Sequence, residues 1–579
     1  MWFLAYFLLH LAFYTLIRVE FLIWNWDSFK SMPVTEILWA FLNGLRFDLS
    51  VLGLTVGLCF LGLIWLSRHI KLQKIWFLFF IFINFVFFVI NTFDVELFNF
   101  TAKRFSSSGL YLVGEGSFAQ YIEPYLLPVI LSFFVLGCYA YLAYQLSRRF
   151  QFNSGFKNKI LISFLILLVS VVFSRGGFQL KPLTFVDAKL FNNSYANNLV
   201  LNSTFTILKS LGKSSLQRIN HFETKEMLSL LNSQDIEALS VTNNQKSNIV
   251  IVILESFSKE YLALQNPEAT PFLNQLRQKG FDFKNAYANG GRSIEGIAAI
   301  FSGIPALMEE PFINSEFSAN QIIGLGSLLA AQNFHTSFFH AAANGSMHFD
   351  RFTKSVGIEN YFGLNEYPDS KDHDGSWGIY DEPYLQWACK KISEFPSPFF
   401  SSIFTLSSHQ PYSLPEQYTD KFKDERAPVL KSIQYTDFSL EQFMKCAEKA
   451  PWYNNTVFIF TADHTGPFLD AKASFESRYQ IPLVLFSPQK ESLGNIDTNQ
   501  YAQHIDLLPT ILDILNIDYK NKNYLSRSLL RSGPKVIALY ADRHYQLIGD
   551  IKDEDKQLKA IQQYFSEGLY DNRLYYPSK

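Results

Sequence analysis

The sequence predicts an α-helical transmembrane bundle of five spans, followed by a separate α/β domain. Residues 1–175 are almost continuously apolar, whereas from residue 247 β-branched runs alternate with helical patterns. Of 579 residues, 48% are hydrophobic, 18% are charged and 58 are Phe, which excludes a disordered or fibrous chain. This length also exceeds what one hydrophobic core usually organises. We therefore expect a membrane domain at 1–175, a juxtamembrane linker at 176–246 and a folded α/β domain, long enough to be a catalytic domain, at 247–579.

The membrane domain is predicted from its apolar runs. A spanning helix needs about 20 mainly apolar residues. Four runs meet this length, and a fifth is shorter but has Lys159 and Arg175 at its ends to reach both interfaces. Arg18 and Glu20 near the end of the first run argue against a cleaved signal peptide. The predicted spans are 2–22, 49–67, 75–91, 127–146 and 160–173.

Basic residues in alternate loops predict the orientation of these spans. The short loops after the second and fourth runs are rich in Lys and Arg, while the longer loops between them carry few. The positive-inside rule therefore places the short loops and the N-terminus in the cytoplasm. Five crossings leave everything after residue 173 outside, where ATP is not available, so we exclude kinase chemistry and favour a lipid or an envelope polymer as substrate.

Charge and cysteine usage narrow the possibilities further. A net charge of −2 gives no general case for nucleic-acid binding. The linker is polar and Asn-rich, with an amphipathic stretch near 199–216 that we expect to lie against the bilayer or the next domain. Cys59 and Cys138 fall in apolar runs. We expect Cys389 and Cys446 to pack as separate thiols rather than to form a disulfide.

The elements of the α/β domain follow from local patterns. The run NIVIVILE at 248–255 is β-branched throughout, as a strand buried on both faces requires. The segment at 271–279 reads as a helix closed by Gly280. We predict further strands at 336–340, 399–406, 457–461 and 483–486, and helices at 294–302, 325–331, 383–395 and 432–447. The alternation implies one sheet with helices on both faces, and its functional groups are expected at the carboxyl ends of the strands.

Two of these strand ends carry metal-ligand types. Glu255 ends the first strand, and Asp463 and His464 follow the strand at 457–461. Carboxylate oxygens and imidazole nitrogen suit a divalent cation. Each residue alone is more often a cap or an ion-pair partner, but both groups following buried strands of one domain is a more specific pattern.

A third segment, NGGRSIEGIAAIFSGIP, places Ser293 at the start of a predicted helix. Free N–H groups and the helix dipole favour a phosphate or an alkoxide at that position. An isolated serine there is usually an N-cap, with Glu295 in the first turn. Arg292 beside it adds a cation suited to a phosphate oxygen.

The motifs ILES, GGRSIEGIAAIFSGIP and TADHTG, in this order behind five apolar runs, resemble the lipoteichoic acid synthase and phosphoglycerol transferase family. RGGFQLKPL and HIDLLPTILDIL are similar to segments of the same family. It is a sulfatase-like branch of the alkaline phosphatase superfamily. The resemblance implies an enzyme of the bacterial cytoplasmic (inner) membrane, with an extracytoplasmic or periplasmic sulfatase-like α/β domain.

The resemblance also implies the site. Glu255, Ser293, Asp463 and His464 match positions that bind one divalent metal, commonly Mn²⁺, with Mg²⁺ or Zn²⁺ as alternatives. Ser293 matches the nucleophile, although the family usually has Thr there; the hydroxyl survives the change. True sulfatases need Cys or Ser followed by x-Pro-x-Arg, a pattern that the residues after Ser293 lack.

A substrate shell is implied as well. His340 and Arg351 match residues that contact the phosphoglycerol head group, and His409 matches a histidine near the reacting phosphate, which we assign as general acid. Arg292 is a further phosphate-binding candidate. Four more residues are candidates that we expect to be structural: His348, Trp377, His504 and Asp506.

The implied reaction moves phosphoglycerol from phosphatidylglycerol, through a covalent Ser293 intermediate, to a hydroxyl of an envelope glycolipid, glycan or polymer. Three alternatives stay open. A phosphoethanolamine transferase shares the superfamily and the anchored architecture. A phosphodiesterase or phosphatase would pass the intermediate to water. A non-catalytic scaffold or sensor would have no reason to keep all four ligand types.

Overall fold

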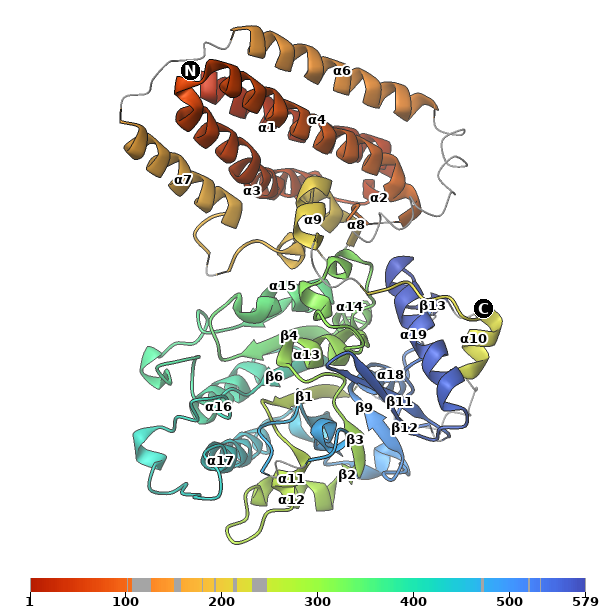
Figure 1. Ribbon diagram of the computed structural model, residues 1–579. Coiled ribbons are helices and arrows are strands. Elements are labelled where there is room, and N and C mark those ends of the chain that lie inside the picture. Colours follow the sequence, from red (N-terminus) through yellow and green to blue (C-terminus); the bar gives the residue numbers. More distant parts are fainter. Residues whose placement is uncertain are drawn as a thin grey trace. The chain divides into compact units, whose positions relative to one another are not determined.

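The computed structural model describes residues 2–101, 103–106, 126–149, 158–179, 181–191, 194–211, 216–231, 247–469, 473–518, 521–531 and 533–577. The chain divides into two compact units (Figure 1). The helical unit comprises Met1–Ser215 together with Asn314–Gln321, and the α/β unit comprises Leu216–Ile313 and Ile322–Lys579. The segment predicted as a linker, 176–246, is thus shared between the two units.

The helical unit is built from long apolar helices and a few short ones. These are α1 (Trp2–Trp24), α2 (Trp26–Phe29), α3 (Val34–Trp65), α4 (Ile70–Thr101), α6 (Leu126–Arg149), α7 (Lys159–Arg175), α8 (Ser194–Val200) and α9 (Ser203–Ser210), of which α2, α8 and α9 are short. Within the described residues, three segments are long and apolar enough to cross a membrane: Leu4–Trp24, Val34–Arg68 and Ile70–Asn99. They overlap the first three predicted spans, 2–22, 49–67 and 75–91, and the second begins at Val34, well before the predicted residue 49. The fourth and fifth predicted spans lie in α6 and α7, and a total of five spans stays a prediction.

A buried ion pair joins the first helices of this unit to its last ones. Arg18 of α1 lies 2.6 Å from Asp48 of α3, and both side chains are almost fully buried. Arg18 Nη1 also donates to the carbonyl oxygens of Leu199 and Val200, at 2.5 and 2.7 Å, near the end of α8. Asn202 donates to the same Asp48 carboxylate at 2.8 Å. The part of the predicted linker around α8 therefore packs within the helical unit, because the end of that helix supplies acceptors for a buried arginine.

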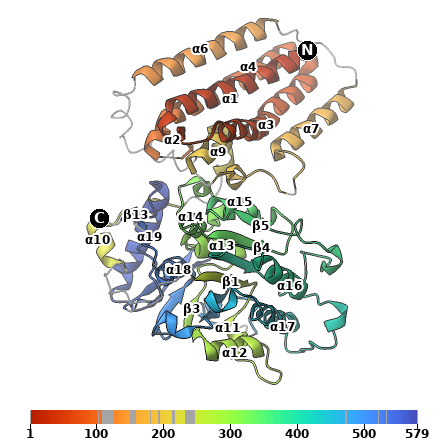
Figure 2. The same cartoon turned by 180° about the vertical axis from the view of Figure 1, so that it is seen from behind.

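The α/β unit contains a seven-stranded sheet in the order β2-β8-β7-β1-β6-β4-β5 (Figures 1 and 2). Its strands are β1 (Asn248–Leu254), β2 (Phe281–Asp282), β4 (His335–His340), β5 (Asn360–Phe362), β6 (Phe399–Phe404), β7 (Thr456–Ala462) and β8 (Leu483–Phe486). The five strands β7, β1, β6, β4 and β5 run parallel, whereas β8 and β2 each pair antiparallel to their neighbour. Every strand predicted from the sequence is present. β1 is central and fully buried, as its β-branched sequence predicts.

Helices of the α/β unit include α10 (Thr224–Leu230), α11 (Lys259–Leu262), α12 (Pro271–Lys279), α13 (Ser293–Ser302), α14 (Leu325–Ala330), α15 (Phe349–Ser355), α16 (Asp381–Ile392), α17 (Leu430–Ala447), α18 (Leu507–Ile514) and α19 (Glu554–Tyr570). Among them, α17 packs against α12 and α16, α13 packs against α14 and α18, and α10 packs against α19. The predicted alternation of strands and helices is present.

Small strands outside the main sheet went unpredicted. They are β3 (Asn285–Tyr287) paired with β9 (Tyr501–Gln503), β10 (Asn521–Lys522) paired with β13 (Tyr576–Pro577), and β11 (Val536–Ala541) paired with β12 (His544–Gly549). The first of these pairs places residues 285–287 beside 501–503, which brings the loop before Ser293 close to His504.

The expectation that Cys389 and Cys446 are separate thiols is wrong. They form a disulfide that joins α16 to α17. The two helices pack side by side with the Cα atoms of the pair 6.4 Å apart, which lies within the range that a disulfide spans.

Candidate active site

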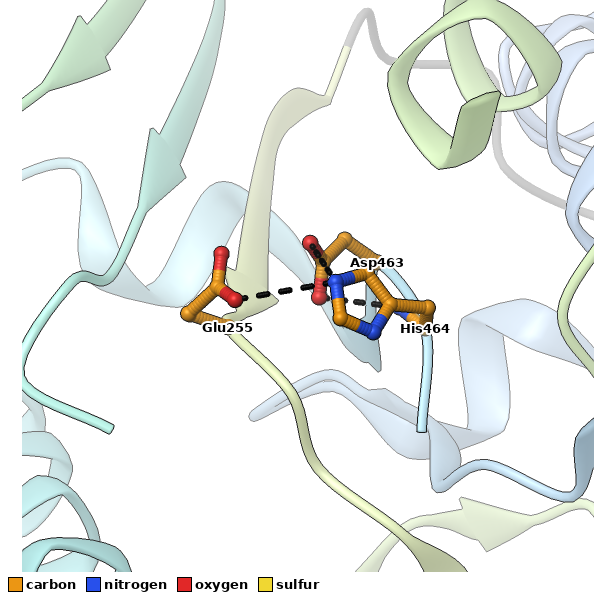
Figure 3. Close-up of side chains that lie close together, drawn as sticks. All are labelled: Glu255, Asp463 and His464. Atoms are coloured by element: carbon orange, nitrogen blue, oxygen red, sulfur yellow. Dashed lines mark hydrogen bonds and ion pairs between the residues drawn. The ribbon is translucent and has the colours of Figure 1, made fainter. Parts of the chain in front are cut away.

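The site begins where two neighbouring strands end. β1 and β7 are parallel with Leu254 opposite Ala462, so the next residues, Glu255 and Asp463, leave the sheet at the same edge. Figure 3 shows the Glu255 side chain facing those of Asp463 and His464. His464 Nε2 lies 3.3 Å from Asp463 Oδ2 and 3.6 Å from Glu255 Oε1. One ligand atom from each residue lies within 4.8 Å of the other two.

Backbone groups orient the Asp463 carboxylate toward this cluster. Its Oδ1 accepts hydrogen bonds from the N–H groups of Ser256 and His464, at 2.9 and 2.8 Å. Its Oδ2 is buried and, among the described residues, has no hydrogen-bond partner. Burial and the nearby Glu255 carboxylate raise the pKa of Asp463 to about 7. The fold therefore holds one carboxylate oxygen in place through backbone hydrogen bonds, and the other oxygen faces the centre of the cluster.

His464 presents a lone pair to the same point. Its Nδ1 lies 2.7 Å from the carbonyl oxygen of Thr465, which can only accept, so Nδ1 carries the proton and Nε2 is left as the acceptor in the neutral ring. Burial lowers the pKa of His464, but the carboxylates of Asp463 and Glu255 outweigh it and raise that pKa above its ordinary value. Two buried carboxylates, an orphaned oxygen and an imidazole nitrogen fit a divalent cation, whose charge would offset the repulsion between the acids.

Ser293 is the first residue of α13, as the sequence predicts. Its Oγ donates to Glu255 Oε2 at 3.2 Å and lies 3.4 Å from His464 Nε2. The close approach depends on Gly296, one turn further along the helix. A Cβ there would lie 2.2 Å from the carbonyl oxygen of Asp463. The structure therefore brings all four predicted metal-binding residues together at the N-terminus of α13.

Arg292 has a different set of contacts. Its guanidinium Nε donates to Glu295 Oε1 at 3.0 Å, and Nη2 donates to the carbonyl oxygen of Glu309 at 3.1 Å. Glu295 also accepts from the N–H of Gly291 at 2.9 Å. These bonds fix the turn before Ser293, so a role for Arg292 in binding a substrate phosphate stays a prediction.

His409 lies on a loop that is tied to Glu255. Ser408 Oγ donates to the carbonyl oxygen of Glu255 at 2.5 Å. The Nδ1 of His409 donates to the carbonyl oxygen of Gln410 at 2.9 Å, and its ring lies 4.1 Å from that of Trp377. Trp377 Nε1 donates to the same Gln410 carbonyl at 2.6 Å. Trp377, which the sequence analysis expects to be structural, therefore helps to position His409. Nε2 of the His409 ring is the nitrogen that can exchange a proton.

Tyr412, on the same loop, was missed by sequence reasoning. Its pKa is raised by burial and then by the charge of Glu255, which places its phenol in the electrostatic reach of the cluster. Tyr412 has a φ of 62°, an uncommon conformation for a non-glycine residue. No spacing rule in the sequence points to it, because its position follows from this turn.

The other predicted substrate residues contact different neighbours. His340 ends β4 and is fully buried, with Nδ1 3.0 Å from the Tyr361 hydroxyl; burial lowers its pKa to about 3. Its Nε2 has no hydrogen-bond partner among the described residues. Arg351, in α15, lies 3.7 Å from Asp350. Neither of these contacts reaches the Ser293 cluster. His348 is buried in the turn before α15.

His504 and Asp506 hold the framework of the site together. His504 Nε2 donates to the carbonyl oxygen of Ala462 at 2.7 Å, and Nδ1 accepts from the Asn289 N–H at 3.2 Å. Burial lowers the pKa of His504 to about 4, so the ring is neutral. Asp506 pairs with the buried Lys535 and accepts from the Arg527 N–H at 2.9 Å. Both residues have the structural roles that the sequence favours.

Comparison with known proteins identifies the α/β unit. Residues 247–517 match the family model described as Sulfatase. The match covers 271 of the 579 residues, and we refer to this segment as the sulfatase-family domain after the model that it matches. The sulfatase-family domain thus includes Glu255, Ser293, Asp463 and His464.

Curated relatives agree with the resemblance seen in the motifs. The chain is 25% identical over 308 residues to the lipoteichoic acid synthase-like protein YvgJ of Bacillus subtilis, covering 49% of each chain. It is 26% identical over 318 residues to a lipoteichoic acid synthase of Staphylococcus aureus, covering 50% of this chain and 48% of that protein. The chain thus spans about half the length of the curated relatives it matches. The predicted likeness to lipoteichoic acid synthases is confirmed.

Two solved structures share the fold of the sulfatase-family domain. A Vibrio parahaemolyticus protein of the alkaline phosphatase superfamily is 23% identical, with a TM-score of 0.54, covering 63% of this chain and 100% of that chain. The lipoteichoic acid synthase LtaP of Listeria monocytogenes is 16% identical, with a TM-score of 0.51, covering 60% and 97%.

Proposed function

We propose that the protein is a membrane-bound, metal-dependent transferase that moves the phosphoglycerol head group of phosphatidylglycerol to a hydroxyl of an envelope glycolipid, glycan or polymer. The observation that carries this proposal is the Ser293 hydroxyl at a helix N-terminus, 3.2 Å from Glu255 and beside Asp463 and His464. Relatives named lipoteichoic acid synthases support this substrate class.

Glu255, Asp463, His464 and the Ser293 hydroxyl would hold one divalent ion, with Mn²⁺ as our first choice and Mg²⁺ or Zn²⁺ as alternatives. When bound, such an ion lowers the pKa of a hydroxyl and neutralises phosphate charge. The fit rests on the orphaned Asp463 oxygen and on the His464 lone pair that faces it.

Ser293 is the nucleophile of the proposed reaction. Its oxygen attacks the phosphorus, an Oγ–P bond forms, and the bond from phosphorus to the diacylglycerol oxygen breaks. Glu255 Oε2 is the acceptor nearest to the hydroxyl proton. The N–H groups at the start of α13 stabilise negative charge on Oγ and on the phosphate. An acceptor hydroxyl then attacks the phosphorus and the Oγ–P bond breaks. The acceptor's proton returns to His409, which gave one up in the first step, and Ser293 Oγ takes back the proton held at Glu255.

His409 is the proposed general acid for the departing diacylglycerol oxygen. Its ring is held by Gln410 and Trp377, and its loop is anchored to Glu255 through Ser408, which leaves Nε2 to deliver the proton. We assign Arg292, His340 and Arg351 to the head group, as the family resemblance implies. In this structure the three side chains contact other protein groups.

We place the sulfatase-family domain on the extracytoplasmic side, with five spans and a cytoplasmic N-terminus. The basic loops support this orientation. The Cys389–Cys446 disulfide supports it independently, since disulfides persist outside the cytoplasm and are rare within it.

The test uses the full chain in vesicles that contain head-group-labelled phosphatidylglycerol. Ser293→Ala is expected to abolish diacylglycerol release and covalent labelling, while Ser293→Thr, which keeps the hydroxyl, retains both. The mass of the adduct on Ser293 identifies the donor head group, with phosphatidylethanolamine as the parallel substrate for the phosphoethanolamine alternative. Undiminished diacylglycerol release by Ser293→Ala would show that Ser293 is not the nucleophile. Release of water-soluble glycerol phosphate in the presence of acceptor would favour hydrolysis over transfer.

A further inference from the structure

The helical unit contains a cavity of about 440 Å³ bordered by α3, α7 and α9. Figures 1 and 2 both show α7 alongside α3. Most of the cavity wall is aliphatic or aromatic. Its apolar side chains include Leu54, Leu58, Leu61, Leu167, Val171 and Phe205.

Small residues bring α3 and α7 together beside this cavity. At Gly57 an added Cβ would lie 2.1 Å from Ser170 Oγ, and at Gly53 it would lie 2.7 Å from the Ser170 carbonyl oxygen. The two helices therefore come close at these positions, and leucines of both helices line the cavity alongside them. Leu58 and Leu167 are each about half exposed, so the cavity opens at the apolar surface of the unit.

One end of the cavity is positively charged. Arg175, at the end of α7, and Lys209, in the last turn of α9, both line it. α9 lies at the Ser50 end of α3, because Phe205 packs on Phe47 with ring centroids 4.9 Å apart. Arg175 lies at the same end, next to Ser174, whose carbonyl oxygen accepts from Ser50 Oγ at 2.7 Å. Both cations therefore lie at one end, and the leucines extend away from them.

The length of the apolar part matches one leaflet of a bilayer. From Ser50 to Leu61, α3 rises about 16 Å at roughly 1.5 Å per residue. The hydrocarbon depth of one leaflet is about 15 Å, half of a core of about 30 Å. An acyl chain lying along α3 and α7 would then place its head group beside Arg175 and Lys209.

We propose that this cavity binds an anionic glycerophospholipid, with one acyl chain against the leucines and the phosphate at Arg175 and Lys209. The paired cations select an anionic head group over a zwitterionic one. In the proposed orientation, this lipid comes from the outer leaflet. The inference does not rest on the proposed transferase reaction, since lipid binding needs no turnover.

The test is native mass spectrometry of the full chain in detergent, carrying Ser293→Ala to prevent turnover, with phosphatidylglycerol and phosphatidylcholine titrated separately. We expect retention of phosphatidylglycerol in preference to phosphatidylcholine. Leu167→Trp, which fills the cavity, is expected to lower the bound phosphatidylglycerol about tenfold. Leu165→Trp is the matched control, because Leu165 lies on the same helix with similar exposure, 50% against 51%, and is not part of the wall.

The charge component has its own matched pair. Arg175→Gln combined with Lys209→Gln is expected to weaken phosphatidylglycerol binding roughly 25-fold, at about fivefold per cation, and to remove the preference over phosphatidylcholine. Lys181→Gln, which removes an exposed cation that does not line the cavity, should change neither.

Equal retention of the two lipids, or equal losses in Leu165→Trp and Leu167→Trp, would overturn the inference. Photo-crosslinking to the unaltered cavity tests the inference without relying on variants that could misfold. Phosphatidylglycerol with a photoreactive acyl chain should label α3 and α7 of the chain with wild-type lining residues. Labelling spread evenly over the described apolar helices would also overturn it.

Discussion

Replacing Gly296 by alanine tests the geometry around Ser293 most directly. A Cβ at this position would lie 2.2 Å from the carbonyl oxygen of Asp463, 2.9 Å from its carbonyl carbon and 3.1 Å from its Cα. All three are backbone atoms, so no rotamer change relieves the overlap. Restoring ordinary contact distances requires α13 to move away from the end of β7 by about 1 Å.

Two effects on stability oppose each other. Alanine in a helix interior is favoured over glycine by about 1 kcal/mol. Overpacking against a rigid neighbour costs about 1–3 kcal/mol. We therefore expect Gly296→Ala to lower the free energy of unfolding by up to about 2 kcal/mol. The same movement carries Ser293 away from Glu255, and a displacement of about 1 Å at reacting atoms costs roughly 100-fold in rate.

Urea unfolding and the kcat/KM for diacylglycerol release measure the two effects separately. Gly291→Ala is the matched control for stability, since an added Cβ there meets nothing within 4 Å. A Gly296→Ala protein that is as stable as wild type and retains its kcat/KM would refute the reasoning. It would mean that α13 is not held against Asp463 as closely as described.

Four further predictions concern the α/β unit. Burial raises the pKa of Asp463 from 3.8 to about 7, so its contribution to the stability of the metal-free protein is present below pH ~4 and lost as the pH rises through ~7. The affinity for Mn²⁺ should rise over the same pH range. Calorimetry should find that Asp463→Asn removes both effects. At a hundredfold excess over its Kd, Mn²⁺ should add about 2.7 kcal/mol to the free energy of unfolding of the wild type, and a flat thermal-shift titration would contradict this. Replacing Cys389 and Cys446 by serine should lower the free energy of unfolding by roughly 2–5 kcal/mol. The control Cys138→Ser, which removes a free thiol, should not lower it. Equal unfolding midpoints with and without the disulfide would count against a structural role for it. His504→Ala should lower the free energy of unfolding by about 1–3 kcal/mol, since it leaves the Ala462 carbonyl and the Asn289 N–H unpaired. Bound Mn²⁺, measured by atomic absorption, should stay at one per chain. Loss of the metal at unchanged stability would make His504 a ligand instead.

The sequence was sufficient to predict the centre of the site because local patterns determine it. The β-branched run before Glu255 and the apolar run before Asp463 each predict a buried strand, and parallel neighbours end at one edge of a sheet. The Gly-Gly turn and the helical spacing after it likewise predict where α13 begins, and with it the position of Ser293.

Features that depend on packing between distant segments were not predictable in this way. Cys389 and Cys446 lie in separate helices, and only the facing of α16 and α17 pairs them. Tyr412 lies in a turn where its φ is 62°, which no local pattern specifies. Arg18 looks like a residue at the end of a span, yet its acceptors include carbonyls 181 and 182 residues later.

That last separation has a consequence for how the protein is made. When α1 enters the bilayer during synthesis, the ribosome has not yet produced the carbonyls of Leu199 and Val200 that Arg18 will contact. Until then Asp48 of α3 is the anionic partner at hand, so pairing of these two helices is expected to come early in biogenesis. A truncated chain that stops at residue 175 would keep a buried guanidinium with part of its shell missing, whereas one that stops at residue 215 would retain it.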